Sequence, residues 1–433
     1  MRIVVITDFM DLKSLGGSTR VVLNHCAELA KRGHEIAVIS GSRNRSGRDT
    51  LGSVCFHWFH YEPDPERRRQ TGEARGLLGA IAPLVLPCRV FGSLARTFSP
   101  EAVMFHQPLS ALSVLSHPRS MTLKRLYNFH SPWCEEFLVE SLAGQWTGAP
   151  PAVPGMRAGS ADQGHSPARR RGGPAFRLGY GLRRNLERQA LRKCRAIVVL
   201  SDYMRSLLGR VHPGRACPVH VIPGAADTAR FFPAADRLEA RRRTGVQPET
   251  FLLSTVRRLI PRMGIPNLIE AVKTLRARGQ AVRLLIGGSG PIEGRLKDLA
   301  RELNVGDDVG FTGNLGEEQM RNLFAASDLV VVPTLALEGF GLVAVEALAC
   351  GTPVLGTPVG GIPEVLSPLD RRLVCAGADA SSIADGIRFW MERRDELELI
   401  RAKCRQYVCD RFTWGRAAER IENALLSMIG SSE

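Results

Sequence analysis

Long hydrophobic runs are missing from this 433-residue sequence: no stretch reaches the roughly 18 to 20 uncharged apolar residues that a membrane-spanning helix needs. The longest candidate, Gly76 to Cys88, is shorter and contains Pro83 and Pro87, so it fits a core or interfacial helix better. The first seven residues run directly into Asp8 without a small-residue cleavage site, which favours a strand over a signal peptide. We therefore expect a cytoplasmic protein.

Paired cysteines are also missing. The ten cysteines are scattered from Cys26 to Cys409 without a Cys-x-x-Cys pair, and the two nearest neighbours, Cys404 and Cys409, have no histidine cluster beside them. The pattern indicates neither a zinc site nor a disulfide framework.

Acidic residues are few relative to basic ones. The 58 Lys and Arg against 43 Asp and Glu give a net charge of +15, which favours an anionic partner such as nucleotide phosphates, a phospholipid surface or nucleic acid. Between Ser166 and Arg195, nine Arg and one Lys face Glu187 alone, a local net charge of +9. One interpretation of this basic block is contact with anionic lipid or a lipid-linked acceptor, supported by the uncharged run 76–88. The other is a solvated, flexible face.

Short β-rich runs alternate with amphipathic helical stretches, a pattern typical of parallel α/β sheets. The expected strands are residues 2–7, 35–40, 102–106, 126–130, 196–201 and 219–223 in the first half, and 251–256, 282–287, 309–313, 328–333, 353–357 and 373–375 in the second. They fit two doubly wound sheets, with a hinge at Pro223–Asp227. Because such sheets bind ligands beyond the carboxyl ends of their strands, two facing sheets create a cleft.

The domain organisation follows from this pattern. We expect a Rossmann-like domain over residues 1–224, a second one over 225–407, and a C-terminal helical segment over 408–433 that packs back on the first domain. Within the first domain, Ala143 to Arg177 changes to Gly, Pro, Ala, Ser and Arg without apolar periodicity, which predicts an exposed flexible insert.

The most informative segment covers residues 334–366. A strand ends at Pro333, a loop follows, and a helix is expected from about Leu342 to Cys350, before Gly351 stops it. The amides of Phe340, Gly341 and Leu342 at the helix start form a ready anion site, because glycine lets a phosphate approach the backbone closely.

Two carboxylates, Glu338 and Glu346, lie eight positions apart on either side of this expected anion site. A carboxylate on each side of a phosphate suits the recognition of hydroxyl groups, one of a sugar and one of a ribose. The alternative is that Glu338 caps the helix and Glu346 is a solvated face residue.

This segment resembles the Glu, seven residues, Glu motif of glycosyltransferase family 4, the retaining enzymes of GT-B fold that use nucleotide sugars. Other motifs agree with the family in their order along the chain: GGSTR at 16–20, YNFHSPW at 127–133, VLS at 199–201, VIPG at 221–224, RRLIPRMG at 257–264 and IGGSGP at 286–291. Each motif alone is weak, but their joint order is specific. The resemblance implies an α/β, GT-B architecture of two Rossmann-like domains facing across a cleft.

The family resemblance also implies roles for individual residues on the phosphate side. Gly16 and Gly17 would approach the donor diphosphate, and Arg258 would hold its phosphates. Where the family commonly has lysine, this chain has Met263. Either Arg262 or Arg257 then supplies the second cation, or the phosphates are held less well. An arginine in place of lysine would change the geometry of phosphate binding as well as its charge.

On the sugar side, the resemblance implies that His130 lies beside the donor sugar, Glu338 contacts its hydroxyls and Glu346 contacts the ribose. His106, at the end of the preceding strand, is a candidate for the acceptor side, with a purely structural role as its alternative. The expected catalytic residues are His130, Glu338 and Arg258, and the remaining expected donor-binding residues are Gly288, Asn314, Leu315, Phe340, Gly341 and Leu342.

The resemblance implies transfer of a hexose-type sugar from a nucleotide-diphosphate sugar to an acceptor hydroxyl with retention, in cell-surface glycan or glycolipid synthesis. The leaving diphosphate would accept the acceptor's proton, so no metal or other cofactor is expected. The acceptor would be lipid-linked and the enzyme peripheral at the inner face of the membrane. The closest alternative is a nucleotide-sugar epimerase or phosphorylase of the same fold.

Other classes fit the sequence less well. A nicotinamide dehydrogenase would carry Gly-x-Gly-x-x-Gly directly after a strand, and a glycosidase would carry a recognisable carboxylate pair. A basic nucleic-acid or membrane-binding protein without catalysis would use the charge of +15. However, only Phe176 and Tyr180 lie among the basic residues, and no nucleic-acid-binding module is recognisable. No nucleic-acid partner is therefore expected.

Overall fold

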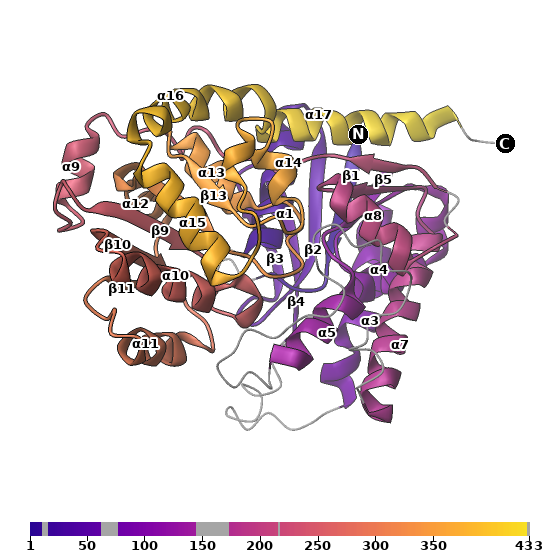
Figure 1. Cartoon of the computed structure of the whole chain (residues 1–433). Coiled ribbons are helices and arrows are strands. Elements are labelled where there is room, and N and C mark those ends of the chain that lie inside the picture. Colours follow the sequence, from indigo (N-terminus) through magenta and orange to yellow (C-terminus); the bar gives the residue numbers. More distant parts are fainter. Residues whose placement is uncertain (11–15, 62–76, 144–172, 215–216, 431–433) are drawn as a thin grey trace.

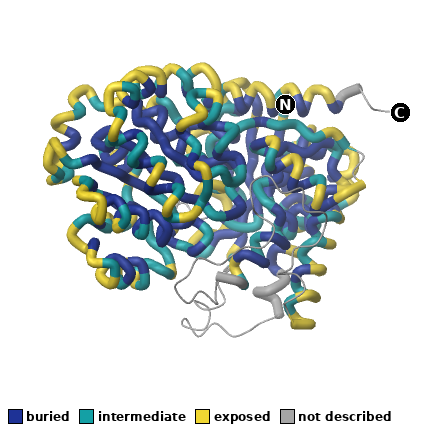
Figure 2. Tube along the Cα trace, in the orientation of Figure 1, coloured by how far each residue is buried: buried dark blue, intermediate teal, exposed yellow. Residues whose placement is uncertain are grey.

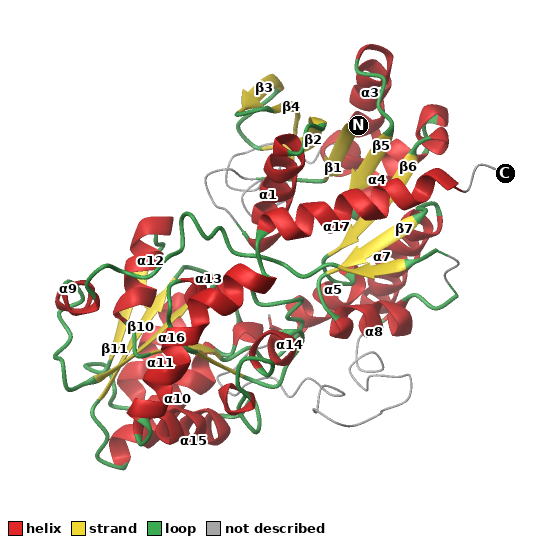
Figure 3. Ribbon diagram, turned by 90° about the horizontal axis from the view of Figure 1, so that it is seen from above, coloured by secondary structure: helices red, strands yellow, loops and turns green. Residues whose placement is uncertain are grey.

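The computed structural model describes residues 1–10, 16–61, 77–143, 173–214 and 217–430. Figures 1 and 3 show two α/β lobes side by side, with the strands β1 to β8 in the first lobe and β9 to β13 in the second. In Figure 2 the buried residues concentrate in the middle of each lobe, and the exposed ones follow the outer helices and loops. Each lobe therefore has its own hydrophobic core.

The sheet of the first lobe has, in the described residues, the strand order β3-β4-β2-β1-β5-β6-β7-β8. All neighbours are parallel except β3 and β4, which pair antiparallel. The strands are β1 (Arg2–Thr7), β2 (Glu35–Ser42), β3 (Gly47–Leu51), β4 (Val54–His60), β5 (Ala102–Phe105), β6 (Lys124–Phe129), β7 (Ala196–Val199) and β8 (Val219–Val221).

Helices cover both faces of this sheet because its central strands are apolar on both sides. On β1, Ile3 and Val5 belong to the core cluster that contains α1 and α17, whereas Val4 and Ile6 belong to the cluster on the opposite face. The helices of this lobe are α1 (Gly17–Lys31), α3 (Leu77–Thr97), α4 (Pro108–Leu115), η1 (Pro118–Thr122), α5 (Trp133–Ala143), α7 (Pro174–Arg192) and α8 (Asp202–Val211).

The second lobe has a parallel sheet with the order β11-β10-β9-β12-β13 in the described residues. Its strands are β9 (Phe251–Val256), β10 (Val282–Gly287), β11 (Val309–Gly313), β12 (Leu329–Val332) and β13 (Val354–Gly356). Its helices are α9 (Arg237–Arg242), η2 (Pro261–Met263), α10 (Ile265–Ala277), α11 (Glu293–Glu302), α12 (Glu317–Ala326), α13 (Leu342–Ala349), α14 (Ile362–Leu366), η3 (Arg371–Leu373), α15 (Ala380–Met391) and α16 (Arg394–Arg411).

The chain passes between the lobes twice, and the two connections lie side by side. Residue Ala226 in the first connection pairs with Thr413 in the second, and its amide donates to the carbonyl of Phe412 over 3.0 Å. After this crossing, α17 (Trp414–Leu426) and η4 (Ser427–Gly430) follow. Figure 1 shows α16 and α17 along one edge of the molecule, and α17 packs on α1 of the first lobe.

The structure departs from the expected secondary structure in three places. The expected strand at 373–375 is wrong: Asp370 accepts a hydrogen bond from the amide of Arg372 and starts the 3-10 turn η3, and only Val374 forms an isolated bridge. Strands β3 and β4 were not expected. The insert expected over 143–177 is wrong at its end, because Pro174 starts helix α7; residues 144–172 lie outside the described residues.

The apolar run 76–88 overlaps α3, which is described from Leu77 and contains Pro83 and Pro87. Among the residues that the structure describes, no helix combines the length and the apolar character that crossing a bilayer requires.

Candidate active site

Loops at the carboxyl ends of both sheets meet where the lobes face each other. The Ser201 hydroxyl, just after β7, donates to the Gly339 carbonyl over 2.7 Å, and a Cβ at residue 339 would lie 3.1 Å from the carbonyl oxygen of His130. On the same border, Glu364 accepts hydrogen bonds from the amides of Asp202 and Tyr203, each over 2.7 Å. The loop that precedes α13 is therefore held directly against the first lobe.

The start of α13 is built to approach a ligand with its backbone. Gly341 has φ of +90°, and a Cβ there would lie 2.5 Å from Cδ1 of Ile362, so glycine is required. The amides of Phe340, Gly341 and Leu342 donate to no other described residue, and no side chain caps the helix. Such a helix start attracts an anion through its free N–H groups and the helix dipole.

Glu338, in the loop before this helix, is fixed by its own lobe. Arg257 forms an ion pair with the Glu338 carboxylate and donates to the Thr334 hydroxyl over 2.8 Å. Burial acts to raise the pKa of Glu338, but the charge and hydrogen bond of Arg257 outweigh burial and lower it below the ordinary value. Glu338 is therefore a carboxylate at neutral pH, with its oxygens able to accept hydrogen bonds only.

The three arginines near the loop after β9 have different positions. The Arg257 guanidinium forms an ion pair with Glu338. The Arg262 guanidinium donates to the carbonyl of Leu337 over 3.1 Å, in the loop that contains Glu338. Arg258 is exposed and has no hydrogen bond or ion pair from its guanidinium to any described residue. Met263, at the position where the resembled family commonly has lysine, is buried in the core of the second lobe. Arg258 is thus the cation that remains available for an anionic ligand.

The backbone on both sides of Arg258 packs against a neighbouring glycine loop. Gly288 has φ of +110°, and a Cβ there would lie 1.9 Å from the Arg257 carbonyl oxygen. A Cβ at Gly290 would likewise lie 2.2 Å from the carbonyl oxygen of Leu259. The two loops therefore pack backbone against backbone, which only glycine permits. Gly288, an expected donor-binding residue, thus packs against the loop that carries Arg258. Gly290, which was not among the expected residues, packs against the same loop.

Glu346 on α13 is paired across the lobes. Nη1 of Arg20, on α1, lies 2.6 Å from Oε1 of Glu346, whose side chain is 6% exposed. Burial raises the pKa of Glu346 above its ordinary value, although Arg20 acts against the shift. Near this pair, a Cβ at Gly17 would lie 3.7 Å from Cδ1 of Leu342, so the glycine pair borders the start of α13, with Gly16 as the N-cap of α1.

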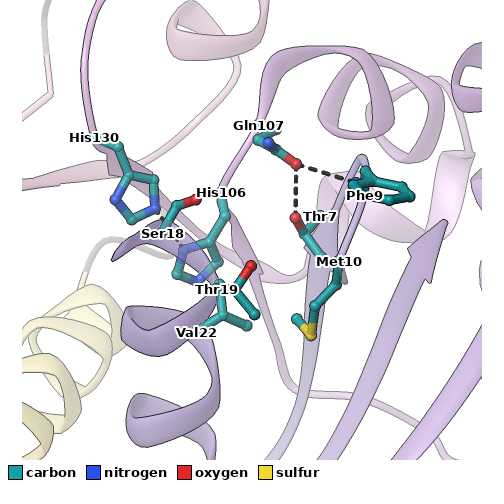
Figure 4. Close-up of a pocket in the computed structure, with 9 residues that line it drawn as sticks. All are labelled: Thr7, Phe9, Met10, Ser18, Thr19, Val22, His106, Gln107 and His130. Carbon is teal, nitrogen blue, oxygen red and sulfur yellow. Dashed lines mark hydrogen bonds between the residues drawn. The ribbon is translucent and has the colours of Figure 1, made fainter. Parts of the chain in front are cut away.

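His130 and His106 form the first-lobe side of the site (Figure 4). Nε2 of His130 lies 3.0 Å from Nδ1 of His106, and the two rings stack with centroids 5.2 Å apart. Burial lowers the pKa of His130 to about 4, and burial with the neighbouring histidines lowers the pKa of His106 well below its ordinary value. Both rings are therefore neutral near pH 7.

These histidines line a small recess at the carboxyl end of the first sheet. The other lining residues, all from the first lobe, are Thr7, Phe9, Met10, Ser18, Thr19, Val22 and Gln107. Figure 4 shows the side chains coming from the strand ends and from the start of α1. Several of the lining side chains carry a hydroxyl or an amide, so a polar ligand would find hydrogen-bonding groups there.

Phe340, Leu315 and Asn314, three of the expected donor-binding residues, differ in the surroundings of their side chains. The Phe340 ring packs against Phe412, with centroids 5.5 Å apart, so only its amide faces an anion site. The Leu315 side chain packs toward Gly287 inside the lobe, and Asn314 is exposed at the end of β11. In the described part of the chain, no group of three or more His, Cys, Asp or Glu residues is arranged to hold a metal ion.

Comparison with protein families gives a clear result. The model described as Glycosyltransferase Family 4 matches residues 15–230, and the model described as Glycosyl transferases group 1 matches residues 236–425. The chain belongs to glycosyltransferase family 4. The family resemblance found in the sequence motifs is therefore confirmed.

Two curated relatives of this family 4 chain are named for glycosyl transfer. It is 31% identical over 238 residues to a GDP-mannose-dependent alpha-(1-6)-phosphatidylinositol monomannoside mannosyltransferase of Mycobacterium tuberculosis, a match that covers 53% of this chain and 61% of the relative. It is 32% identical over 248 residues to a D-inositol 3-phosphate glycosyltransferase of Corynebacterium jeikeium, covering 55% and 59%. The chain thus matches about three fifths of the length of these relatives.

Solved structures confirm the GT-B fold of this glycosyltransferase family member. Sucrose-phosphate synthase from Thermosynechococcus elongatus aligns over the full length of both chains with a TM-score of 0.75 and 20% identity. Anabaena HepE in complex with UDP and glucose aligns over 99% of this chain and 100% of its own, with a TM-score of 0.71 and 16% identity. At such low identity these similarities concern the fold alone.

Sequence reasoning missed two residues of this family 4 site. Arg20 stands in the first glycine motif, but its pairing with Glu346 joins residues 326 positions apart and has no local signal. Asn128 lies on β6, two positions before His130. Its side-chain nitrogen lies 3.3 Å from Nε2 of His106. A signal existed for Asn128, because a buried polar residue in an apolar strand needs a partner.

Proposed function

We propose that this chain is a retaining glycosyltransferase that moves a hexose-type sugar from a nucleotide-diphosphate sugar to an acceptor hydroxyl. The observation that carries the proposal is the row of amides at the start of α13 that donate to no described residue, between the Glu338 carboxylate and the glycine pair of α1. Backbone N–H groups suit a diphosphate, and a fixed carboxylate suits sugar hydroxyls. Family membership supports the same activity.

In the proposed reaction, the bond between the anomeric carbon and the diphosphate oxygen breaks, and the acceptor oxygen bonds to the same face of that carbon. The proton of the acceptor hydroxyl passes to the leaving diphosphate. Amides of α13 and the free guanidinium of Arg258 would stabilise the charge that develops on this leaving group. Glu338, oriented by Arg257, would hold the sugar through its hydroxyls.

We propose Glu346 as the acceptor for hydroxyls of the donor ribose. Its position on the first turns of α13 lies beyond the amides that would bind the diphosphate. The Arg20 guanidinium would then share Glu346 with the ribose or move to a phosphate. Removal of this carboxylate should weaken nucleotide binding more than it slows transfer, since the ribose is remote from the bond that changes.

The donor and acceptor are proposed from the relatives. One relative is named for GDP-mannose and a phosphatidylinositol monomannoside, and the HepE structure holds UDP and glucose. We propose that the acceptor is lipid-linked and that synthesis serves a glycolipid or a cell-surface glycan. A transfer assay with GDP-mannose or UDP-glucose and a phosphatidylinositol-based acceptor tests both points, with product separated by thin-layer chromatography.

The test of the main proposal compares Arg258→Ala with Arg301→Ala, which removes an exposed arginine from α11. We expect Arg258→Ala to lower kcat by roughly a hundredfold, the size of effect seen when one stabilising donor is removed, and Arg301→Ala to retain activity. Near-normal transfer by Arg258→Ala would remove the assignment. A donor that changes without any acceptor would indicate an epimerase instead.

We further propose that α7 rests on an anionic membrane surface. Its side chains Leu178 and Leu182 are 74% and 55% exposed and lie one turn apart, and the adjacent Arg177 is exposed as well. Exposed leucines beside arginines suit insertion into the interface of an anionic bilayer.

The membrane proposal is tested by flotation with vesicles of phosphatidylcholine and phosphatidylinositol. We expect binding by the full chain and its loss in the double variant Leu178→Asp and Leu182→Asp. Leu399→Asp, which alters a leucine 66% exposed on α16 of the other lobe, is the matched control. Equal binding by the double variant and the control would contradict a role for α7.

A further inference from the structure

We propose that Asn128 is a positioning residue that determines which ring nitrogen of His130 carries the proton, and that it acts through His106. The consequence is that His130 presents an N–H donor, rather than a lone pair, on the side of its ring away from His106. This inference deepens the proposed function and rests on it wherever sugar transfer is concerned. The hydrogen-bond chain itself depends only on the arrangement of these three side chains.

The first step is the orientation of the Asn128 amide. Asn128 is 2% exposed on β6, and its Nδ2 lies 3.3 Å from Nε2 of His106 and 3.5 Å from the carbonyl oxygen of Phe105. That carbonyl can only accept, so the nitrogen must face it. The opposite orientation would place oxygen against oxygen and bury an NH₂ group without a partner. Asn128 therefore donates to Nε2 of His106.

The orientation of the Asn128 amide fixes the tautomer of His106 and, through it, the tautomer of His130. A neutral imidazole has one N–H and one lone pair, so His106, accepting at Nε2, must carry its hydrogen on Nδ1. His106 then donates from Nδ1 to Nε2 of His130, 3.0 Å away. Since Nε2 of His130 accepts, the hydrogen of His130 lies on Nδ1. One buried amide thus sets the tautomer of two successive rings.

The third step concerns what His130 offers to a ligand. In Figure 4 its second ring nitrogen points away from His106. Nδ1 of His130 has no partner in the described part of the chain, and His130 is only half-buried. The backbone of this residue already touches the Glu338 to Gly341 loop, since a Cβ at Gly339 would lie 3.1 Å from its carbonyl oxygen. The Nδ1–H group is therefore available to donate to an oxygen of a ligand held there.

A fixed N–H donor has a definite chemical meaning in the proposed transfer. His130 can donate a hydrogen bond to a sugar oxygen, but its Nδ1 cannot receive the acceptor's proton while the chain of hydrogen bonds persists. His25, whose ring is tilted to that of His106 with centroids 6.4 Å apart, does not alter this result, because it forms no hydrogen bond with a described residue. The tautomer is set from the Asn128 end alone.

The experiment is nitrogen NMR of the full chain labelled with ¹⁵N-histidine at pH 7. The signals of His106 and His130 are assigned from the variants His106→Gln and His130→Gln. We expect protonated Nδ1 and unprotonated Nε2 in both rings. The variant Asn128→Leu, similar in volume and without a donor, should shift both rings toward the Nε2–H tautomer. Asn423→Leu, on the exposed face of α17, should leave both unchanged.

A kinetic measurement accompanies the spectra. We expect Asn128→Leu to lower kcat about tenfold while the KM for the nucleotide sugar stays within about twofold, because only the donor hydrogen of His130 is misplaced. The Nε2–H tautomer of His130 in the unaltered chain, or an unchanged tautomer in folded Asn128→Leu, would overturn the proposal. If Asn128→Leu does not fold, the spectrum of the unaltered chain decides alone.

Separate results would contradict the proposed sugar transfer and the hydrogen-bond chain. A chain that transfers no sugar from any nucleotide donor but shows the Nδ1–H tautomer would remove the proposed function and leave the hydrogen-bond chain intact. A chain that transfers sugar with His130 in the Nε2–H form would remove this inference alone.

Discussion

Glu338 and Glu346 flank the same helix start, yet they differ in the lobe that supplies their partner and in the direction of their pKa shift. Glu338 is held by Arg257 within its own lobe, and the pKa of Glu338 is lowered despite burial. Glu346 is held by Arg20 from the other lobe, and burial keeps the pKa of Glu346 raised. The Glu338 carboxylate is thus held by a residue of its own lobe. The Glu346 carboxylate is held by a residue of the first lobe, so one carboxylate is fixed within the second lobe and the other across both lobes.

The largest effect should come from breaking the pair inside the lobe. Arg257→Ala leaves the Glu338 carboxylate without its partner, and removal of one member of a buried pair costs about 3 to 5 kcal/mol. We expect this loss in the free energy of unfolding, measured by urea denaturation. Arg257→Lys keeps the charge and should lose much less. Equal stability of Arg257→Ala and the unaltered chain would show that Glu338 is not held by Arg257.

The next effect concerns activity rather than stability. Glu338→Gln keeps the shape of the side chain but replaces an acceptor oxygen by a donor, so we expect kcat to fall by roughly a hundredfold. Glu364→Gln is the matched control on the same border, because its carboxylate binds backbone amides of α8 instead. Steady-state transfer assays measure both. Similar losses in the two variants would mean that lobe contact, and not sugar binding, explains the effect.

A smaller effect is expected for the pair between the lobes. Arg20→Ala and Glu346→Gln each remove one member, and we expect a coupling energy of about 1 kcal/mol in a double-mutant cycle. Nucleotide binding by calorimetry provides the measurement, since Glu346 is proposed to meet the ribose. Strictly additive effects of the two substitutions would show that Arg20 and Glu346 act independently.

The smallest effect should be the dependence of stability on pH. The lowered pKa of Glu338 contributes stability above its ordinary value of 4.5, and this contribution is lost as the pH falls through the lowered pKa. The raised pKa of Glu346 acts in the opposite direction, because the folded state binds its proton more tightly. Stability from this group therefore falls as the pH rises from 4.5 through the raised pKa.

Unfolding curves between pH 3 and pH 7 can separate the two carboxylates. We expect Glu338→Gln to reduce the loss of stability on the acid side. Glu346→Gln should remove the decline in stability above the ordinary glutamate pKa. Identical pH profiles for the two variants would contradict the difference in environment between these two residues.

The sequence predicted those parts of the fold whose signal is local. Strands β9 and β10 are mostly apolar and almost entirely buried, so the sequence marks them clearly and their bounds agree with the expectation. All five residues of β3 are exposed, and it is stabilised by pairing with β4, which leaves no apolar pattern to detect. The helix after Gly341 was also predictable from the sequence, because Gly341 and Gly351 mark its two ends and an apolar run lies between them.

Sequence motifs predicted only those parts of the site whose residues are close together along the chain. The neighbourhood of Glu338 and Gly341 is contiguous in sequence, whereas the partners of the two carboxylates come from other strands and from another lobe. The placement of Asn128 beside His106 requires β6 to pair with β5, with Tyr127 opposite Phe105. Strand order is a property of the assembled sheet, so no spacing along the chain contains it.

The paired connections at Ala226 and Phe412 have a mechanical consequence. Because one connection is hydrogen-bonded to the other, both crossings between the lobes lie at a single place. A protease that cut the chain near residue 224 would leave both halves joined through the second crossing and through α17 docked on α1. The nicked protein should therefore still migrate as one particle under native conditions.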